Sequence, residues 1–133
     1  MYKLYFDGAS RNNPGPAGYG GVILDKDNNE CFIYFDKFEK PQTNNYAEYY
    51  ALYAGLSVAV SNNISELEVY GDSNLVVQQM NKKWRVKSEN LKDIFNKCTK
   101  LLENFDNISF NHILRKYNKR ADELANKGLD SLN

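Results

Sequence analysis

Residues 2–10 read YKLYFDGAS and, after a turn rich in glycine and proline, residues 18–24 read GYGGVIL. In the first segment, Leu4 and Phe6 recur with the two-residue period of a β-strand, so Asp7 leaves that strand on the opposite face. The second segment is apolar and follows the turn, which predicts a neighbouring strand. Two interpretations of Asp7 are open on this stretch alone. It is either a functional carboxylate or the residue that ends the strand with a hydrogen bond into the turn.

The composition indicates a folded globular protein. A chain of 133 residues has the length of one domain with one sizeable core, so we expect a single domain over residues 1–133. The 42% of hydrophobic residues, with ten Tyr and seven Phe among them, argue against a disordered chain. No apolar run approaches the length of a membrane span, and no signal-peptide pattern opens the sequence. We therefore expect a cytoplasmic protein with no membrane partner. We also expect a monomer.

Charge is balanced overall but clustered locally. The 17 basic and 17 acidic side chains cancel, which argues against an unspecialised nucleic-acid binder. From Lys82 to Lys100, however, seven Lys or Arg stand against two acids. Such a stripe can follow a phosphate backbone, but a solvated helix face has the same composition. Charge alone leaves both interpretations open.

The rest of the chain predicts a third strand and then alternating helices and strands. A polar turn over residues 25–30 leads into the third strand, so the first three strands form an antiparallel meander. From Thr43 the apolar period changes to that of a helix. The predicted strands cover residues 2–8, 18–25, 31–35, 67–71 and 107–114, and the predicted helices cover 43–60, 90–103 and 119–129, with another helix beginning near Leu75.

The helix predicted over residues 43–60 carries one acid on an otherwise apolar stripe. Small residues at 51, 55 and 59 would let this helix approach a sheet closely. Glu48 is the charged member of that stripe. It is either a functional carboxylate or part of a capping box, with Asn45 as the N-cap and Glu48 bonding back to it.

Asp72 and Asp122 also have two interpretations each. Asp72 follows a predicted strand, and either Asp72 or Ser73 can cap the next helix. Asp122 lies in the first turn of the last helix, where the helix dipole favours an acid. Yet these acids, like Asp7 and Glu48, sit at a strand end or in a first helical turn. In a meander followed by alternating helices and strands, such ends can meet at one edge of the sheet.

Four converging carboxylates have a chemical consequence. Like charges a few ångströms apart disfavour ionisation, and divalent cations relieve the repulsion. Ligands that are all oxygen favour Mg²⁺ or Mn²⁺ over zinc. Two such ions about 4 Å apart are the usual arrangement for phosphodiester displacement. The acids therefore predict a two-ion site, whereas an ordinary α/β domain with acids as caps would bind no metal.

Five motifs in order resemble type 1 ribonuclease H and span nearly the whole chain: YFDGA (5–9), NPGPAG (13–18), TNNYAE (43–48), YGDS (70–73) and NKRADELA (118–125). The resemblance implies an α/β fold with a five-stranded mixed sheet of order 3-2-1-4-5, strand 2 antiparallel, flanked by helices. It implies endonucleolytic hydrolysis of the RNA strand of RNA–DNA hybrids by two metal ions. Attack in line by a metal-bound water would expel the 3′ oxygen of the preceding nucleotide, so we expect 5′-phosphate and 3′-hydroxyl ends. The alternative is a catalytically silent binding or scaffold module, which would have no reason to keep all the acids.

The resemblance also implies a role for each acid. The counterpart of Asp7 bridges two Mg²⁺ ions, for which Mn²⁺ can substitute. The counterparts of Glu48 and Asp72 complete the shell of one ion, and that of Asp122 completes the other. A short connection, residues 85–89, replaces the extra helix and basic loop of some bacterial enzymes, so the likeness is to the compact archaeal and bacterial members. Activity on double-stranded RNA is left open.

Substrate contacts follow from the same resemblance. Asn13, Asn44 and Asn45 correspond to residues that read the minor groove of the hybrid, where contacts can sense 2′-hydroxyls. Thr43 corresponds to a residue near a DNA phosphate. Trp84 corresponds to the aromatic that lines the DNA-strand channel, although its spacing from Asp72 is one residue longer than in some bacterial members. Its other interpretation is an ordinary helix-end aromatic.

His112 and Arg115 compete for one auxiliary role. His112 precedes Asp122 by ten residues, the separation at which some members place a histidine that assists proton transfer or product release. Here, however, the surrounding residues predict strand. Arg115 follows that strand and resembles the arginine that reaches the scissile phosphate in the compact subgroup. Arginine can stabilise phosphoryl charge but is a poor proton shuttle, whereas histidine titrates near neutrality. We favour Arg115.

Overall fold

The computed structural model describes residues 1–131, which form five strands and four α-helices. Two short 3₁₀ helices join them. The elements in chain order are β1 (Tyr2–Ser10), β2 (Ala17–Leu24), β3 (Glu30–Lys37), α1 (Asn44–Ser61), β4 (Glu66–Gly71), α2 (Asn74–Met80), α3 (Glu89–Leu101), η1 (Leu102–Asn104), β5 (Asn107–His112), η2 (Arg115–Tyr117) and α4 (Lys119–Asp130).

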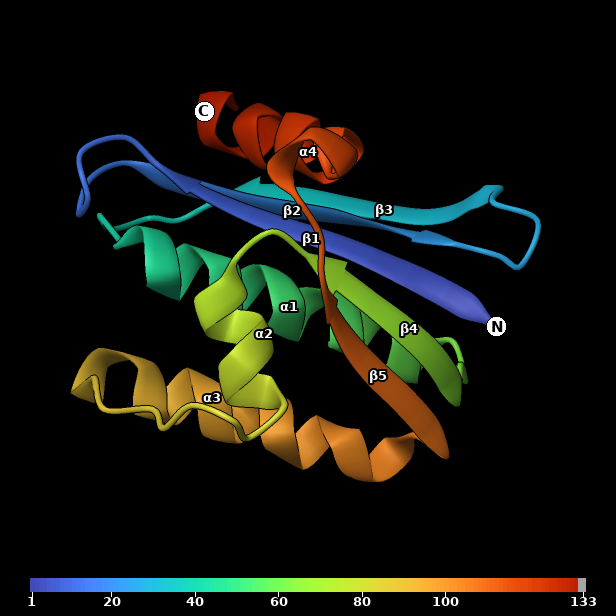
Figure 1. The fold of residues 1–133 in the computed structure, drawn as a ribbon. Coiled ribbons are helices and arrows are strands. Elements are labelled where there is room, and N and C mark those ends of the chain that lie inside the picture. The colour runs from blue at the N-terminus through green and yellow to red at the C-terminus, as the bar shows by residue number, and fades with distance from the viewer. Residues whose placement is uncertain (132–133) are drawn as a thin grey trace.

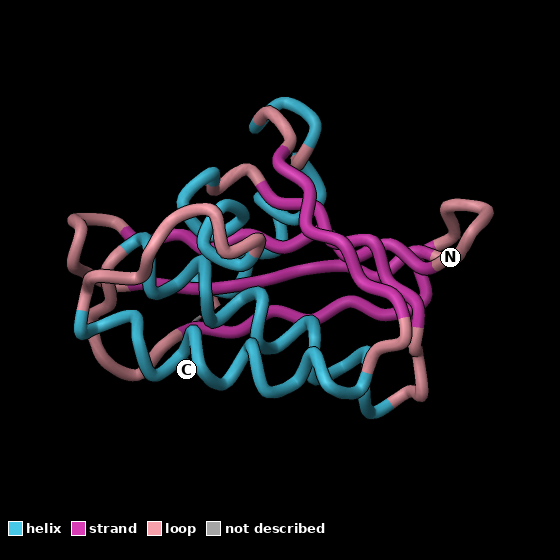
Figure 2. The backbone as a smooth tube through the Cα atoms, turned by 60° about the horizontal axis from the view of Figure 1, so that its bottom comes forward, coloured by secondary structure: helices cyan, strands magenta, loops and turns pink. Residues whose placement is uncertain are grey.

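The strands form one mixed sheet with the order β3-β2-β1-β4-β5. β2 is antiparallel to both β1 and β3, whereas β4 is parallel to both β1 and β5. Helix α4 covers one face of this sheet, and α1, α2 and α3 lie on the other face (Figure 1). The strands lie together in one layer when the molecule is turned (Figure 2). The predicted order and the antiparallel β2 are therefore confirmed.

β1 is the central strand, and its alternation separates an apolar face from Asp7. Leu4 and Phe6 are fully buried on the side of α1. Gly8 lets that helix come close, because a Cβ at this position would lie 2.3 Å from the backbone carbon of Ala47. Asp7 points to the other face, where α4 packs, and is only 5% exposed. Burial of this carboxylate therefore follows from a helix that lies more than a hundred residues later in the chain.

Two strand boundaries differ from the sequence-based prediction in ways that matter for the site. β1 extends to Ser10, so Asp7 lies inside the strand, and the strand-end interpretation of Asp7 is wrong. β5 ends at His112 rather than Leu114. Its neighbour β4 ends at Gly71, whose carbonyl accepts a last hydrogen bond from Ile113 N at 2.9 Å. Beyond that point β5 has no strand beside it, and the chain turns into η2.

Helix α1 packs on the sheet through its stripe of small residues. Ala51, Gly55 and Ala59 are among its buried residues. A Cβ on Gly55 would lie 2.4 Å from the hydroxyl of Tyr34 and 2.7 Å from Leu4. That hydroxyl donates a 2.7 Å hydrogen bond to the carbonyl of Ala51, which fixes the helix on the meander. Within residues 1–131, no helix combines the length and the apolar character needed to cross a membrane.

Candidate active site

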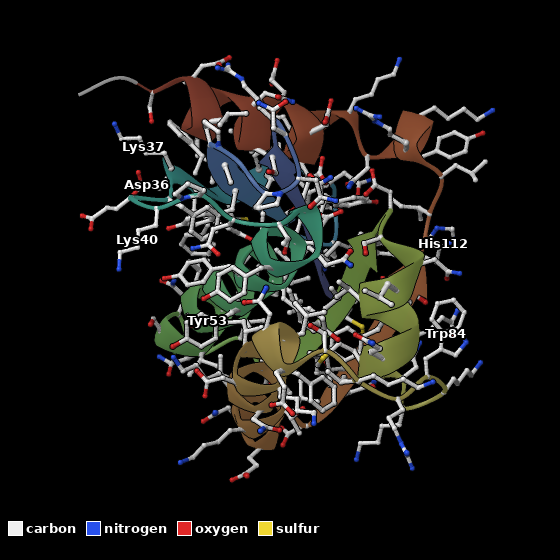
Figure 3. All side chains as sticks on the ribbon, turned by 90° about the vertical axis from the view of Figure 1, so that its left-hand side faces the viewer. Asp36, Lys37, Lys40, Tyr53, Trp84 and His112 are labelled. Carbon is white, nitrogen blue, oxygen red and sulfur yellow. The ribbon has the colours of Figure 1, made fainter. Side chains whose placement is uncertain are left out.

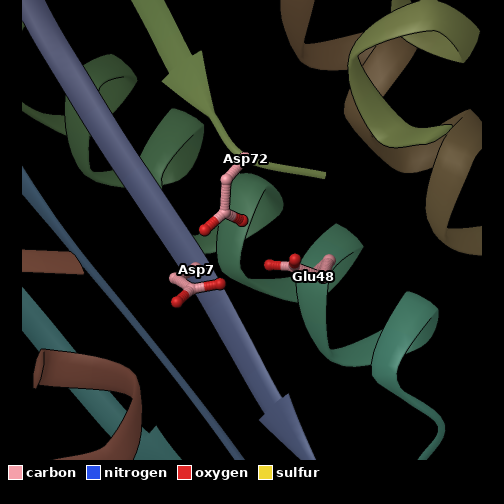
Figure 4. A group of neighbouring side chains, drawn as sticks. All are labelled: Asp7, Glu48 and Asp72. Atoms are coloured by element: carbon pink, nitrogen blue, oxygen red, sulfur yellow. The ribbon is translucent and has the colours of Figure 1, made fainter. Parts of the chain in front are cut away.

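Three carboxylates from three different elements meet at one end of the sheet (Figure 4). Asp7 lies in β1 and Glu48 near the start of α1, and Asp72 is the residue directly after β4. Each offers one oxygen, and these oxygens all lie within 4.8 Å of one another. The structure thus brings three of the four predicted acids together.

The backbone N–H of Gly8 ties two of these carboxylates together. It donates to Asp7 Oδ1 at 3.0 Å and to Glu48 Oε1 at 2.6 Å. Glu48 therefore reaches across to β1 instead of back along its own helix. The N-cap of α1 is Thr43, whose Oγ1 accepts from Tyr46 N at 3.1 Å. The capping-box interpretation, with Asn45 as N-cap, is therefore wrong.

Asp72 is not needed as a helix cap either. Ser73 caps α2, because its Oγ accepts from Val76 N at 3.3 Å. Burial raises the pKa of Asp72, and the neighbouring Asn118 side chain opposes this rise. The Nδ2 of the buried Asn118 side chain donates to the Phe6 carbonyl at 3.0 Å, and the backbone carbonyl of Asn118 accepts from Asp122 N at 3.0 Å. Asn118 thus joins β1, through its side chain, to the start of α4, through its backbone.

Asp122 lies beside the three carboxylates and is not part of the closest group. It sits in the first turn of α4, as predicted, with a half-buried side chain. Asn126 Nδ2 donates to its Oδ1 at 3.3 Å. Arg115 Nη2 approaches the same oxygen to 3.9 Å, while the Arg115 side chain is 82% exposed. Such an exposed ion pair is weak, so Arg115 can leave it for another anion at little cost.

Burial and mutual repulsion hold protons on the acids. Burial raises the pKa of Asp7 to about 7, a hydrogen bond with Glu48 opposes this, and the charges of Asp72 and Asp122 add to it. Burial, then the charge of Asp7, raises the pKa of Glu48 well above its usual range. Burial also raises the pKa of Asp72, although Asn118 and Arg115 lower it. Without a cation, Asp7, Glu48 and Asp72 therefore cannot all ionise readily at neutral pH.

The donor set fits a hard divalent cation. The three closest side chains offer carboxylate oxygens, which are the ligands of Mg²⁺ and Mn²⁺, and the cluster contains neither Cys nor His. A cation would also relieve the repulsion that adds to burial in raising the three pKa values. Asp7, Glu48 and Asp72 could thus hold a metal ion.

The stability of the metal-free protein should fall as the pH rises. The pKa of Asp7 increases from 3.8 to about 7 on folding. The stabilisation that this proton provides is complete below pH 3.8 and is lost as the pH rises through about 7. We expect a loss on the order of 1 kcal/mol per pH unit over that interval.

Thermal unfolding in a chelator at about pH 5.5 and about pH 7.5 measures this loss. Mg²⁺ should restore more stability at the higher pH, because cations and protons compete for the same oxygens. A metal-free protein that is more stable at the higher pH would contradict the assignment.

The acids open onto a cleft of about 530 Å³ that also contains Asn44 and Arg115. Asn44 Oδ1 accepts from Ser10 N at 3.0 Å, and Asn13 Oδ1 accepts from Asn44 N at 2.9 Å. Since both oxygens are already engaged, both side chains are left with their NH₂ groups as donors. Asn45 is exposed in the first turn of α1. These three predicted substrate residues lie around the N-terminus of α1, next to Glu48.

Thr43 and Trp84 lie farther out. Thr43 Oγ1, besides capping α1, accepts from Asn90 Nδ2 at 3.5 Å. Trp84 is 47% exposed and belongs to a separate groove of about 570 Å³ between α2 and α3. It does not line the acidic cleft.

The structure separates the two candidates for the auxiliary role. His112 ends β5 opposite Gly71 and is exposed. Its side chain points outward at the same edge as Trp84 (Figure 3). Arg115 lines the acidic cleft, whereas His112 does not.

Sequence reasoning assigned no role to Asn118, although this residue opens the motif that contains Asp122. It is 1% exposed, and its Oδ1 has no hydrogen-bond partner among the described residues. A polar residue four positions before an acid at a helix start is an ordinary pattern. The sequence pattern around Asn118 therefore does not reveal its role. That role depends on a hydrogen bond to the carbonyl of Phe6, which is distant in the chain.

Known proteins resemble this chain over most of its length. A family profile described as "Reverse transcriptase-like" matches residues 5–128. "Bifunctional protein Rv2228c" of Mycobacterium tuberculosis is 40% identical over 94% of this chain, which spans about a third (34%) of that relative's length. "Ribonuclease H" of Desulforamulus reducens is 34% identical, and the match covers 92% of this chain and 83% of that relative's length.

Solved structures agree with these matches. RNase H1 of the archaeon Halobacterium salinarum is 40% identical with a TM-score of 0.92, covering 97% of this chain and 97% of that one. LC11-RNase H1, in complex with an RNA/DNA hybrid, is 38% identical with a TM-score of 0.90, covering 98% of this chain and 97% of that one. The profile, the relatives and the folds coincide with the acids at the end of the sheet, and the chain belongs to the ribonuclease H family.

Proposed function

We propose that this chain hydrolyses the RNA strand of RNA–DNA hybrids at internal positions with the help of divalent metal ions. The observation that carries the proposal is the cluster of Asp7, Glu48 and Asp72, with oxygens within 4.8 Å of one another, in a member of the ribonuclease H family. The hybrid bound to LC11-RNase H1, a protein 38% identical to this chain, supports a hybrid as the substrate here as well.

The acids would hold two Mg²⁺ ions, for which Mn²⁺ can substitute. Asp7, the most buried of them, would serve both ions, with Glu48 and Asp72 on one side and Asp122 on the other. When bound, such ions activate water and neutralise charge on the phosphoryl group. The chain itself contributes orientation: Gly8 N–H fixes Asp7 and Glu48, while Asn118 joins β1 to the start of α4, which carries Asp122.

Recognition of the RNA strand would come from the residues around the start of α1. Asn13 and Asn44 present NH₂ donors because their oxygens are bonded within the protein. Donors suit the acceptor atoms of the minor groove and the 2′-hydroxyls that distinguish RNA from DNA. Asn45 is exposed beside them, and Thr43 and Trp84 would contact the DNA strand.

The products test the reaction class. Incubation of an end-labelled hybrid with Mg²⁺ should give 5′-phosphate and 3′-hydroxyl ends. In this reaction a water oxygen bonds to phosphorus, the bond from phosphorus to the 3′ oxygen of the preceding nucleotide breaks, and that oxygen leaves with a proton. Products with a 2′,3′-cyclic phosphate would mean that the 2′-hydroxyl was the nucleophile and would refute the mechanism.

Matched substrates define the specificity. The same RNA as a single strand, as a duplex with RNA and as a hybrid with DNA should be compared with and without a chelator. We expect cleavage of the hybrid that depends on the metal ion, and cleavage of the RNA duplex would extend the substrate range. Binding of the hybrid without any cleavage in Mg²⁺ or Mn²⁺ would favour the silent binding module.

A further inference from the structure

The segment between α2 and α3 combines basic and aromatic side chains without a helix or strand of its own. We call residues 82–86 the basic-aromatic segment. Its Lys82, Lys83, Trp84 and Arg85 are all exposed, and the groove they border also contains Lys92 and Phe95 of α3. Cations beside an aromatic ring suit a nucleic-acid strand. Such a surface binds well only if something holds it in place, because ordering a loose segment on binding costs affinity.

The first half of the segment is held by the end of α2. The backbone N–H of Lys83 and that of Trp84 both donate to the carbonyl of Gln78, at 2.9 and 3.3 Å. The second half is held by a side chain. Gln79 Nε2 donates to the carbonyl of Arg85 at 3.2 Å.

Gln79 is itself fixed from the core. It is 4% exposed, among the buried apolar residues of α2, and its Oε1 accepts from the hydroxyl of Tyr49 at 2.6 Å. Tyr49 is fully buried in α1 and directly follows Glu48. Its ring also packs edge-on against Phe95 at 6.3 Å. One amide thus connects the helix that carries a site acid to the backbone of the basic-aromatic segment.

Core packing alone does not explain an amide at this position. A buried amide costs free energy unless both its donor and its acceptor are bonded, and an aliphatic side chain of similar size would fill the same space. Here the side-chain oxygen of Gln79 bonds to Tyr49 of α1, and its side-chain nitrogen bonds to the backbone of Arg85. The two bonds together join α1 to residue 85.

We propose that Gln79 is a positioning residue that sets the basic-aromatic segment at a fixed distance from the carboxylates, so that the segment binds the hybrid in register with the cleavage site. This inference rests on the proposed function, since the segment would contact the nucleic acid. Gln79 touches no reacting atom. Its loss should therefore weaken substrate binding more than it slows the bound enzyme.

Gln79→Met tests the proposal, because methionine keeps the length of the side chain and removes both hydrogen bonds. Gln78→Met is the matched control, since the Gln78 side chain bonds to Asn74 within the same helix at 3.1 Å. We expect Gln79→Met to raise KM for the hybrid about three- to tenfold, the factor expected for losing the one bond that holds the segment at Arg85, with kcat nearly unchanged. The control should match the wild type.

Trp84 provides a second readout that requires no nucleic acid. It is the single tryptophan of the chain, so its fluorescence reports on the basic-aromatic segment alone. Acrylamide should quench Trp84 more strongly in Gln79→Met than in the wild type or in Gln78→Met. Tyr49→Phe, which removes one hydroxyl and keeps the packing, should change the quenching in the same direction but less, because the bond to Arg85 remains.

The outcomes separate this inference from the proposed function. A folded Gln79→Met with wild-type quenching and wild-type KM would overturn the positioning role, and so would equal effects in Gln78→Met. If Gln79→Met does not fold, unchanged quenching in Tyr49→Phe overturns it instead. If the wild type neither binds nor cleaves the hybrid, the proposed function fails, while the quenching of Trp84 still decides whether Gln79 orders the segment.

Discussion

Asp7→Asn should reduce cleavage of an RNA–DNA hybrid by about a thousandfold or more. Asp7 is the most buried of the acids, and its oxygens lie among those of Glu48 and Asp72. Asparagine keeps the shape and can still accept the Gly8 N–H, but it lacks the charge that a shared cation ligand needs. Single-turnover rates in Mg²⁺ with enzyme in excess measure the loss at the chemical step, and losses of this size are typical for a central catalytic group.

The same substitution should stabilise the metal-free protein. Burial and the neighbouring acids raise the pKa of Asp7 to about 7, so at higher pH the folded state carries charges that repel one another. Removing one charge should increase the free energy of unfolding in a chelator at about pH 8 by roughly 1–3 kcal/mol. It should also reduce the stabilisation by Mg²⁺, because binding to the native state is what raises stability.

Asp27→Asn is a suitable control, because it makes the same charge change in an exposed turn. It should alter neither cleavage nor the response to Mg²⁺. A strongly destabilised Asp7→Asn whose unfolding does not depend on metal would instead show that Asp7 has a purely structural role in β1.

The two-residue period of β1 and the helical period after Thr43 predict the elements around the acids, because both patterns are local. The burial of Asp7 is not local. It depends on α4, whose close approach to the meander is possible because Gly20, the partner of Asp7 in β2, has no side chain. No period in residues 2–10 contains that information, so the sequence left Asp7 with two interpretations.

The cap of α1 shows a similar limit. Thr43 and Asn45 are both good N-cap residues, and Glu48 stands three positions after Asn45, as a capping box requires. The choice is made by β1, because Gly8 N–H offers Glu48 a hydrogen bond at 2.6 Å. A tertiary contact between residues 40 positions apart thus overrides a sound local pattern.

Buried polar residues were the hardest to identify. Gln78 and Gln79 are adjacent and chemically identical, yet the first bonds within its own helix and the second joins two helices and a loop. Helix periodicity alone places Gln79 beside apolar residues without saying what its amide bonds to. The sheet order, similarly, followed from the resemblance to a family and not from the strand patterns themselves.

Arg115→Ala should lower kcat by about ten- to a hundredfold, with a smaller change in KM. Arg115 lines the acidic cleft and lies 3.9 Å from Asp122 in a weak, exposed ion pair, so it can turn to the phosphate of a bound strand. A guanidinium there would stabilise charge that grows during phosphoryl transfer, which is worth factors of this size. Arg115→Lys should recover part of the rate, because lysine keeps the charge but loses the forked geometry.

His112→Ala should change kcat by less than about threefold, because the imidazole ends β5 outside the cleft and points toward solvent. Steady-state rates of both variants in the same Mg²⁺ buffer, measured from about pH 5.5 to about pH 8.5, distinguish the two residues. A guanidinium stays charged throughout this interval, so the pH profile of Arg115→Ala should keep the wild-type shape at a lower level. If His112→Ala is the slower variant and also loses a rise in rate between about pH 6 and 7, the histidine transfers the proton and Arg115 does not hold the auxiliary role.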